Sequence, residues 1–287
     1  MPDHYANTAM KLTDPIPASN AMEEPEAAVA AFYRDVLLRL DAASVPYLVG
    51  GTYAFNRYTG INRPTKDLDL FIRRSDFERV SAVFQAAGYR CELTFPHWLG
   101  KIHLDDNYID LIFSSGNAVA NVDDAWFEFA ADAQVLGLPA RISPIEEMIW
   151  SKAFIMEKER FDGADIAHLI YACSDRIDWT RLLRRFGEHW RVLLSHLVLF
   201  GFAYPANRDR VPVGMMDELI RRLSYETHAP PPHTDLCLGT LLSREQYLND
   251  VHLQGLQDAR VQPVGNMTPE DTASWTRAIA DDHEPQA

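Results

Sequence analysis

Cysteines and long apolar runs are scarce in this sequence. Its three cysteines, Cys91, Cys173 and Cys237, lie far apart and lack the spacing of metal ligands, so we expect neither a disulfide framework nor a zinc site. The most apolar run, residues 192–202, is interrupted by Ser195 and His196 and is too short to span a bilayer. We therefore expect a protein of the reducing cytoplasm, without a secretion signal and without membrane contact.

Basic residues are also few, because 27 lysines and arginines face 41 aspartates and glutamates, for a formal net charge of −14. This balance argues against strong general binding of nucleic acid, which depends on clustered basic residues. It does not exclude an RNA substrate, since short basic runs occur at residues 73–74 and 181–185. We interpret the second run as an exposed helix face, either solvated or holding an acceptor's phosphates, formed by Arg181, Arg184 and Arg185.

Residues 47–52 contain a feature that phosphate chemistry needs. Residues 47–49 predict a short buried strand that ends at Gly50 and Gly51. Two glycines there let the backbone turn sharply and approach a ligand closely. We expect Thr52 to cap the following helix, whose first free amide hydrogens would face the same spot.

The next predicted strand, residues 67–72, alternates acidic and apolar residues. Asp67 and Asp69 point to one face, and Leu68 and Leu70 point to the other. Two neighbouring carboxylates repel each other unless a cation neutralises them, and hard oxygen ligands suit magnesium bound together with substrate phosphates. The alternative interpretation is an ordinary turn followed by a solvated strand.

Taken together, the glycine pair and the acidic strand resemble the signature of the DNA polymerase β-like nucleotidyltransferase superfamily, a Gly-Gly or Gly-Ser turn followed by Asp-hydrophobic-Asp. The gap between the two motifs is longer than usual in that superfamily, so we expect an extra turn around residues 59–62. The lead-in Arg63-Pro64-Thr65-Lys66 resembles the Arg-x-Ser/Thr-x-Asp form of the bacterial abortive-infection nucleotidyltransferase toxins. This closer resemblance suggests a toxin-antitoxin-like protein.

A third acid lies in residues 101–113, which predict two strands joined by a tight turn at residues 105–107. Asp110 is embedded in the second strand beside Ile109 and Leu111, where an unpaired carboxylate would be costly, so we expect a metal ion or a base as its partner. In the superfamily a third strand supplies the acid that acts on the attacking hydroxyl, and the resemblance transfers that role to Asp110. The alternative is a solvated aspartate of an edge strand.

Lys152 lies in the middle of an apolar stripe on a long helix predicted from Pro144 to beyond Met156. Such a lysine either extends its stem to solvent or points into a cleft toward an anion. Residues 159–166 resemble the helices that follow the catalytic domain of the abortive-infection group, which implies that Lys152 contacts the triphosphate and that Asp165 helps the site. The ordinary alternative is a lysine that reaches solvent and an aspartate that caps a helix.

The predicted fold is α/β, with a small mixed sheet that carries the three acids, flanking helices and a following helical domain. The expected divisions are a mobile segment at residues 1–24, a catalytic domain at 25–143, a helical domain at 144–228, and a Pro-rich linker with a C-terminal extension at 229–287. Within residues 117–142 we expect a short helix and one further strand. The extension should contain a helix over 244–253 capped by Ser243, and a frayed end with a helix near Trp275.

The resemblance implies a metal-dependent enzyme that transfers a nucleoside monophosphate from an NTP to a hydroxyl of an RNA, protein or small-molecule acceptor. Two Mg²⁺ ions, which Mn²⁺ could replace, would be held by Asp67, Asp69 and Asp110. The NTP, with ATP expected, would be bound by Gly50, Gly51, Thr52, Lys152 and Asp165. The first alternative is a catalytically inactive protein of the same fold that binds a nucleotide or a partner, and the second is an interaction protein without a nucleotide site.

Overall fold

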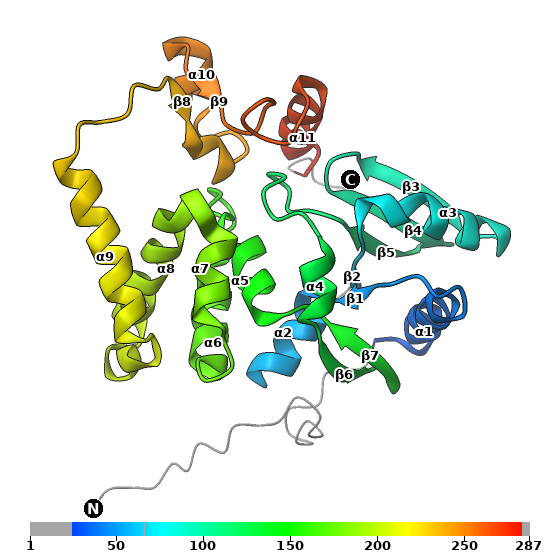
Figure 1. The fold of residues 1–287 in the computed structure, drawn as a ribbon. Helices are drawn as coiled ribbons and strands as arrows, with labels where there is room; N and C mark the ends of the chain where they lie inside the picture. Colours follow the sequence, from blue (N-terminus) through cyan, green and yellow to red (C-terminus); the bar gives the residue numbers. More distant parts are fainter. Residues whose placement is uncertain (1–24, 66, 283–287) are drawn as a thin grey trace, which may run out of the picture.

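The computed structural model describes residues 25–65 and 67–282 (Figure 1). The expected mobile segment at residues 1–24 and Lys66 of the lead-in lie outside this part of the chain. The centre of the fold is a seven-stranded mixed sheet with the strand order β3-β4-β5-β2-β1-β7-β6. Its strands are β1 (Leu48–Val49), β2 (Asp69–Phe71), β3 (Arg90–Phe95), β4 (Leu99–Leu104), β5 (Asn107–Ile112), β6 (Ala131–Val135) and β7 (Leu138–Ile142).

Apolar residues at alternate positions explain why the central strands are buried. Leu68, Leu70 and Ile72 are fully buried, and so are Ile109 and Leu111 of β5. Because side chains alternate across a strand, the acids between them are placed on the opposite face. The predicted alternation on both strands, and with it the α/β fold, is confirmed.

Helices cover the sheet and continue beyond it. α1 (Ala27–Ala42) and α3 (Phe77–Ala86) contact each other and the sheet, while α2 (Gly51–Thr59) follows β1 and α4 (Asp124–Glu128) precedes β6. The helices after the sheet pack on one another in a separate group, to the left in Figure 1. They are α5 (Ile145–Ala153), α6 (Gly163–Cys173), α7 (Trp179–Phe186), α8 (Trp190–Ala203) and α9 (Val213–His228).

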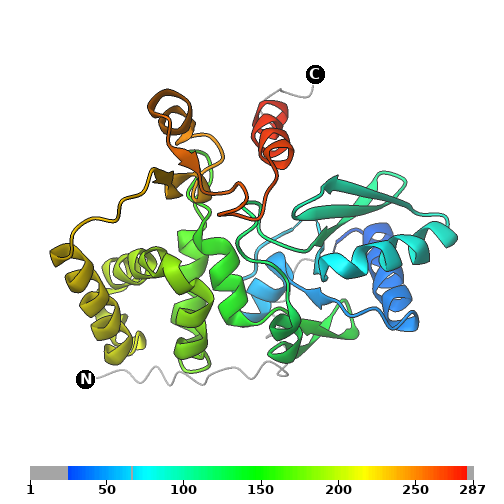
Figure 2. The same cartoon turned by 45° about the horizontal axis from the view of Figure 1, so that its top comes forward.

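Residues after α9 return to the central sheet. They form a two-stranded sheet of β8 (Leu236–Cys237) and β9 (Gln257–Asp258), and the helices α10 (Leu248–Gln254) and α11 (Pro269–Asp282). α11 lies against β3 (Figure 2), and its Trp275 ring packs edge-on against Phe95 and Trp98. The helix predicted near Trp275 is therefore present, and aromatic packing holds it on the sheet.

Three local predictions are wrong. The segment before α5 contains two strands, β6 and β7, rather than one; they are joined by Leu136 and Gly137, both at positive φ, a tight hairpin turn without the usual Asn-Gly or Asp-Gly signal. α5 ends at Ala153, since the chain then folds back and the amide of Met156 donates to Leu242 O. α10 begins at Leu248 rather than at residue 244, although the Ser243 hydroxyl accepts from the amide of Gln246 while it donates to Glu157.

Candidate active site

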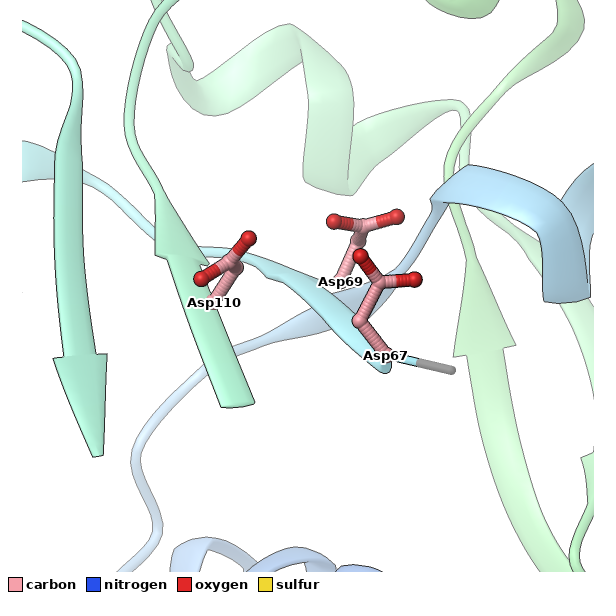
Figure 3. A group of neighbouring side chains, drawn as sticks. All are labelled: Asp67, Asp69 and Asp110. Atoms are coloured by element: carbon pink, nitrogen blue, oxygen red, sulfur yellow. The ribbon is translucent and has the colours of Figure 1, made fainter. Parts of the chain in front are cut away.

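The three acids meet where β2 and β5 run side by side. These strands are parallel and in a register that places Asp69 opposite Asp110. Each of Asp67, Asp69 and Asp110 offers one carboxylate oxygen, and these oxygens all lie within 4.8 Å of one another. Figure 3 shows the carboxyl groups gathered over the two strands. The structure thus brings together the three acids that the sequence singles out.

Burial and the two neighbouring acids together disfavour the ionised form of Asp69. Burial, reinforced by the charges of Asp67 and Asp110, raises the pKa of Asp69 to about 7, although Lys152 and Arg160 act in the opposite direction. Such a shift means that the ionised group has too little neutralising charge around it. A divalent cation would supply that charge, and the donor set of three carboxylates suits Mg²⁺ or Mn²⁺.

Asp110 has the basic partner that its sequence environment requires. Lys101 is directly opposite on β4, and its Nζ lies 2.9 Å from Asp110 Oδ1. Burial raises the pKa of Asp110, while the hydrogen bond and charge of Lys101 partly oppose that rise. Asp67 is instead held by Thr65, whose hydroxyl donates to Asp67 Oδ1 at 2.6 Å. Two neighbours thus orient the outer two carboxylates.

The glycine turn fits closely around the acidic strand. The amide of Gly50 donates to Asp69 O at 3.0 Å, and Gly50 is the N-cap residue of α2. The helix already begins at Gly51, and no side chain caps it, so the capping role predicted for Thr52 is wrong. A Cβ atom on Gly50 would lie 2.1 Å from the Phe71 ring, which shows that this turn packs tightly on β2.

A cleft of about 670 Å³ opens over the acids. Of the residues singled out from the sequence, Gly50 is not part of its lining. The remaining seven line it: Gly51, Thr52, Asp67, Asp69, Asp110, Lys152 and Asp165. Residues 240–244 and Trp275 close another part of the cleft, and no pattern in the sequence indicated that the C-terminal extension would reach this cleft.

Lys152 faces the cleft, where carboxylates hold it. Its Nζ lies 2.8 Å from Asp162 Oδ2 and 2.9 Å from Asp165 Oδ2. Arg160 also donates to Asp162, and Arg63 donates to Asp165. This arrangement places three cations and two acids in the cleft that holds Asp67, Asp69 and Asp110. Arg63 was not among the predicted site residues, although it lies in the lead-in motif.

A comparison with family models identifies residues 33–146 with the model for aminoglycoside-2''-adenylyltransferase. The matched residues include the glycine turn, the three acids and all seven strands of the central sheet. The match places the region with the sheet and the three acids in the nucleotidyltransferase superfamily. The superfamily indicated by the glycine and acid motifs is therefore confirmed, and the chain is a nucleotidyltransferase, while the closer likeness to abortive-infection toxins stays a prediction.

Solved structures of low identity resemble this nucleotidyltransferase. The solution structure of the antibiotic-resistance factor ANT(2'')-Ia is 18% identical, covering 60% of this chain and 98% of that chain, with a TM-score of 0.42. The lincomycin-bound lincosamide antibiotic adenylyltransferase LnuA is 17% identical over 49% of this chain and 94% of its own, with a TM-score of 0.35. JHP933 from Helicobacter pylori is 13% identical over 72% of this chain and 97% of its own, with a TM-score of 0.33. No curated protein matches the chain.

None of the helices in residues 25–65 and 67–282 of this nucleotidyltransferase has both the length and the apolar character needed to cross a membrane.

Proposed function

We propose that this nucleotidyltransferase transfers AMP from ATP to a hydroxyl group of a small molecule. The observation that carries the proposal is the meeting of Asp67, Asp69 and Asp110 beside the glycine turn. The match to an aminoglycoside-2''-adenylyltransferase model supports ATP as the donor and a small molecule as the acceptor. The cleft of about 670 Å³ lies within the usual size range of small-molecule sites.

A divalent metal ion fits the residues that would hold it. Asp67 and Asp69 would bind two Mg²⁺ ions or Mn²⁺ ions, and Asp110 would share the ion on the acceptor side. The raised pKa of Asp69 supports this role, because it reports negative charge that the protein alone leaves poorly neutralised. When bound, the metal would polarise the α-phosphate and lower the pKa of the attacking hydroxyl.

The protein's own groups divide the remaining work. Gly51 and Thr52, at the start of α2, would direct backbone amides to the phosphates of the NTP. Lys152 would contact the triphosphate and offset part of its negative charge. Asp165 would hold Lys152 and Arg63 in place through its ion pairs with both.

Asp110 would accept the proton of the acceptor hydroxyl. The acceptor oxygen then forms a bond to the α-phosphorus as the bond from that phosphorus to the bridging oxygen breaks. Pyrophosphate leaves with the electron pair of the broken bond, and the proton passes from Asp110 to solvent. Lys101, 2.9 Å from Asp110, would keep this carboxylate ionised and ready for the transfer.

We also propose three functional regions in the described chain. Residues 25–143 would form the catalytic unit, since they contain the sheet and the acids. Residues 144–228 would form the helical unit, which contributes Lys152 and Asp165. Residues 229–282 would be an extension that closes one side of the cleft.

The test is Mg²⁺-dependent ATP binding by wild type and Asp69→Asn, with Asp106→Asn as the control. Asp106 is an exposed acid of the turn between β4 and β5. Ligand at a hundredfold excess over its dissociation constant should stabilise wild type and the control by ~2.7 kcal/mol, and Asp69→Asn should keep its fold but lose this gain. Equal stabilisation of all three proteins would contradict the assignment of the acids.

Two further measurements separate the proposal from its alternatives. An inactive binding protein would show the thermal shift but would release no pyrophosphate with any acceptor. An interaction protein without a nucleotide site would show no shift at all. Incubation with α-labelled ATP and separated small-molecule, RNA and protein fractions then identifies the acceptor class, and label confined to RNA or protein would overturn the small-molecule acceptor.

A further inference from the structure

One side of the cleft is aromatic, and the chemistry of the three acids does not account for it. Phe95 and Trp98 lie at the turn between β3 and β4, with ring centroids 5.9 Å apart and an interplanar angle of 13°. Trp275 of α11 packs edge-on against both, at 5.1 Å from each. All three rings line the cleft, so this aromatic wall, Phe95, Trp98 and Trp275, faces the ligand space.

The aromatic wall lies on the Asp110 side of the acids. β5, which carries Asp110, pairs with β4 on one edge and with β2 on the other. Beyond β5 the chain continues through Ser114, which lines the cleft, and the amide of Phe113 donates to Trp98 O at 3.0 Å. The glycine turn and Lys152 reach the cleft from α2 and α5. These helices follow β1 and β7, which lie on the other side of β2 from β5. The wall is therefore on the side where the acceptor, rather than the triphosphate, would bind.

Two buried polar atoms on this side point to a ligand. Ser114 is 1% exposed, and its Oγ has no hydrogen-bond partner among the described residues. The same holds for the indole Nε1 of Trp98. Buried polar groups usually have partners, because leaving one unpaired is costly. A ligand with polar atoms beside a flat apolar group would satisfy both.

The charged residue at this wall does not favour a polyamine. The Arg244 guanidinium lies 4.6 Å over the Trp275 ring. Glu157, an acid that lines the same cleft, is already engaged by Arg244 and by the hydroxyl of Ser243. A cationic acceptor would have to displace Arg244 to reach that carboxylate. A neutral aromatic face would instead pack on the rings without displacing charge.

We propose that the aromatic wall is the acceptor subsite, and that the acceptor is an alcohol with an aromatic or other flat group beside its reactive hydroxyl. This inference rests on the proposed transfer to a small molecule. Trp98 would stack on or meet the flat group edge-on, and Ser114 would donate to one of its polar atoms. Trp275 makes the C-terminal extension a part of acceptor selection rather than a distant appendage.

The test uses two probe pairs that differ only in the flat group. They are p-nitrophenyl β-glucoside against methyl β-glucoside, and uridine against methyl β-riboside, titrated by saturation-transfer NMR. In at least one pair, the compound with the flat group should bind to wild type at least about tenfold more tightly than its methyl counterpart. A gain of this size is typical of an aromatic stacking contact. Equal binding within both pairs would overturn the proposal.

Variants then locate the contact. Trp98→Leu should remove the preference for the flat group, whereas Trp179→Leu, a tryptophan of α7 outside the cleft lining, should keep it. Trp275→Leu provides a second change from the C-terminal side, and melting curves show whether each variant is folded. A preference that survives in folded Trp98→Leu and Trp275→Leu would place the subsite elsewhere.

ATP binding in the presence of Mg²⁺ is measured on the same proteins. It should be unchanged in Trp98→Leu, since the aromatic wall lies away from the glycine turn. If wild type binds no ATP, the proposed function fails, whereas loss of ATP binding in Trp98→Leu alone would mean that the wall serves the nucleotide and not the acceptor.

Discussion

Gly51 lies so close to Asp69 that a Cβ atom on this glycine would be 1.6 Å from Asp69 Oδ2. Gly51 also has a φ of +51°, a conformation that residues with side chains rarely adopt. The glycine turn therefore does two things. It opens the start of α2 to a ligand, and it leaves the space in which the central carboxylate sits.

Gly51→Ala should accordingly damage the acid site itself. We expect metal-dependent ATP binding and transfer to fall by about a hundredfold or more, because the methyl group displaces Asp69, and stability to fall by about 1–3 kcal/mol through backbone strain. Calorimetric titration and a denaturation curve measure the two effects. Gly214→Ala is the matched control, since a Cβ there meets no atom within 4 Å and its φ is not positive. Normal binding by Gly51→Ala would show that Asp69 can move without consequence.

Lys152→Ala should weaken ATP binding or transfer about tenfold to a hundredfold, the value of a charge-assisted contact to phosphate. Stability should change little, because Arg160 still pairs with Asp162 and Arg63 still pairs with Asp165. ATP titration beside a melting curve measures both quantities.

The control for this lysine is Lys158→Ala, an exposed lysine after α5 whose side chain is 72% accessible. It should leave both quantities unchanged. If Lys152→Ala keeps the wild-type dissociation constant but melts at a lower temperature, the nucleotide site ends at the sheet and the lysine is structural.

Arg181→Met should destabilise the protein strongly. Arg181 is buried and lies between the carboxylates of Glu146 and Glu147, with its Nη1 2.5 Å from Glu147 Oε1. Removing it leaves buried acids with too little positive charge, which typically costs about 3–5 kcal/mol. Arg184→Met, at an exposed position of the same helix, should change the free energy of unfolding by about 0.5 kcal/mol or less. Similar urea midpoints for the two variants would mean that Arg185 alone neutralises the buried acids.

Metal affinity should depend on pH near neutrality. Because burial and neighbouring acids raise the pKa of Asp69 to about 7, this group carries a proton below that pH, and the proton must leave before a metal binds. Mn²⁺ affinity should thus fall by about tenfold for each pH unit below 7 and level off above it. Calorimetry between pH 5.5 and 8 measures the slope. Asp106→Asn should reproduce it, and a flat wild-type profile would show that Asp69 is ionised throughout.

The acids were predictable because their signal is local. Alternation of Asp67 and Asp69 with Leu68 and Leu70 assigns the faces of β2 without knowledge of any other strand. Asp110 shows the same pattern on β5. What the local pattern could not supply is the register, and the parallel pairing that places Asp69 opposite Asp110 is a property of the folded sheet.

Arg181 shows what local sequence patterns do not predict. Arg181, Arg184 and Arg185 were interpreted as one exposed face. That interpretation is wrong for Arg181, which is buried, and for Arg185, whose side chain is 14% accessible and pairs with Glu147 and Asp123. The partners of Arg181, Glu146 and Glu147, lie on α5, 35 and 34 residues earlier in the chain. In the sequence those glutamates have a sufficient local explanation as acids in the first turn of a helix, so nothing indicated that they would be buried and need a cation.

The aromatic wall was hidden for a related reason. Trp275 lies in a polar segment, and its contacts with Phe95 and Trp98 join residues separated by most of the chain. Asn117 shows the same long reach, since its side chain donates to Leu241 O at 2.7 Å. Periodicity describes a helix and its apolar face, but it does not identify the surface on which a short C-terminal helix will pack.

The late position of that wall in the chain has a consequence for synthesis. During translation, β1 to β7 and all three acids emerge from the ribosome well before residues 240–244 and Trp275. Domains fold largely in the order in which they emerge. A nascent chain can therefore complete its metal-binding carboxylates while one side of the cleft is still untranslated. A message truncated after α9 would encode a protein with the reactive acids but without the surface that we expect to choose what they act on.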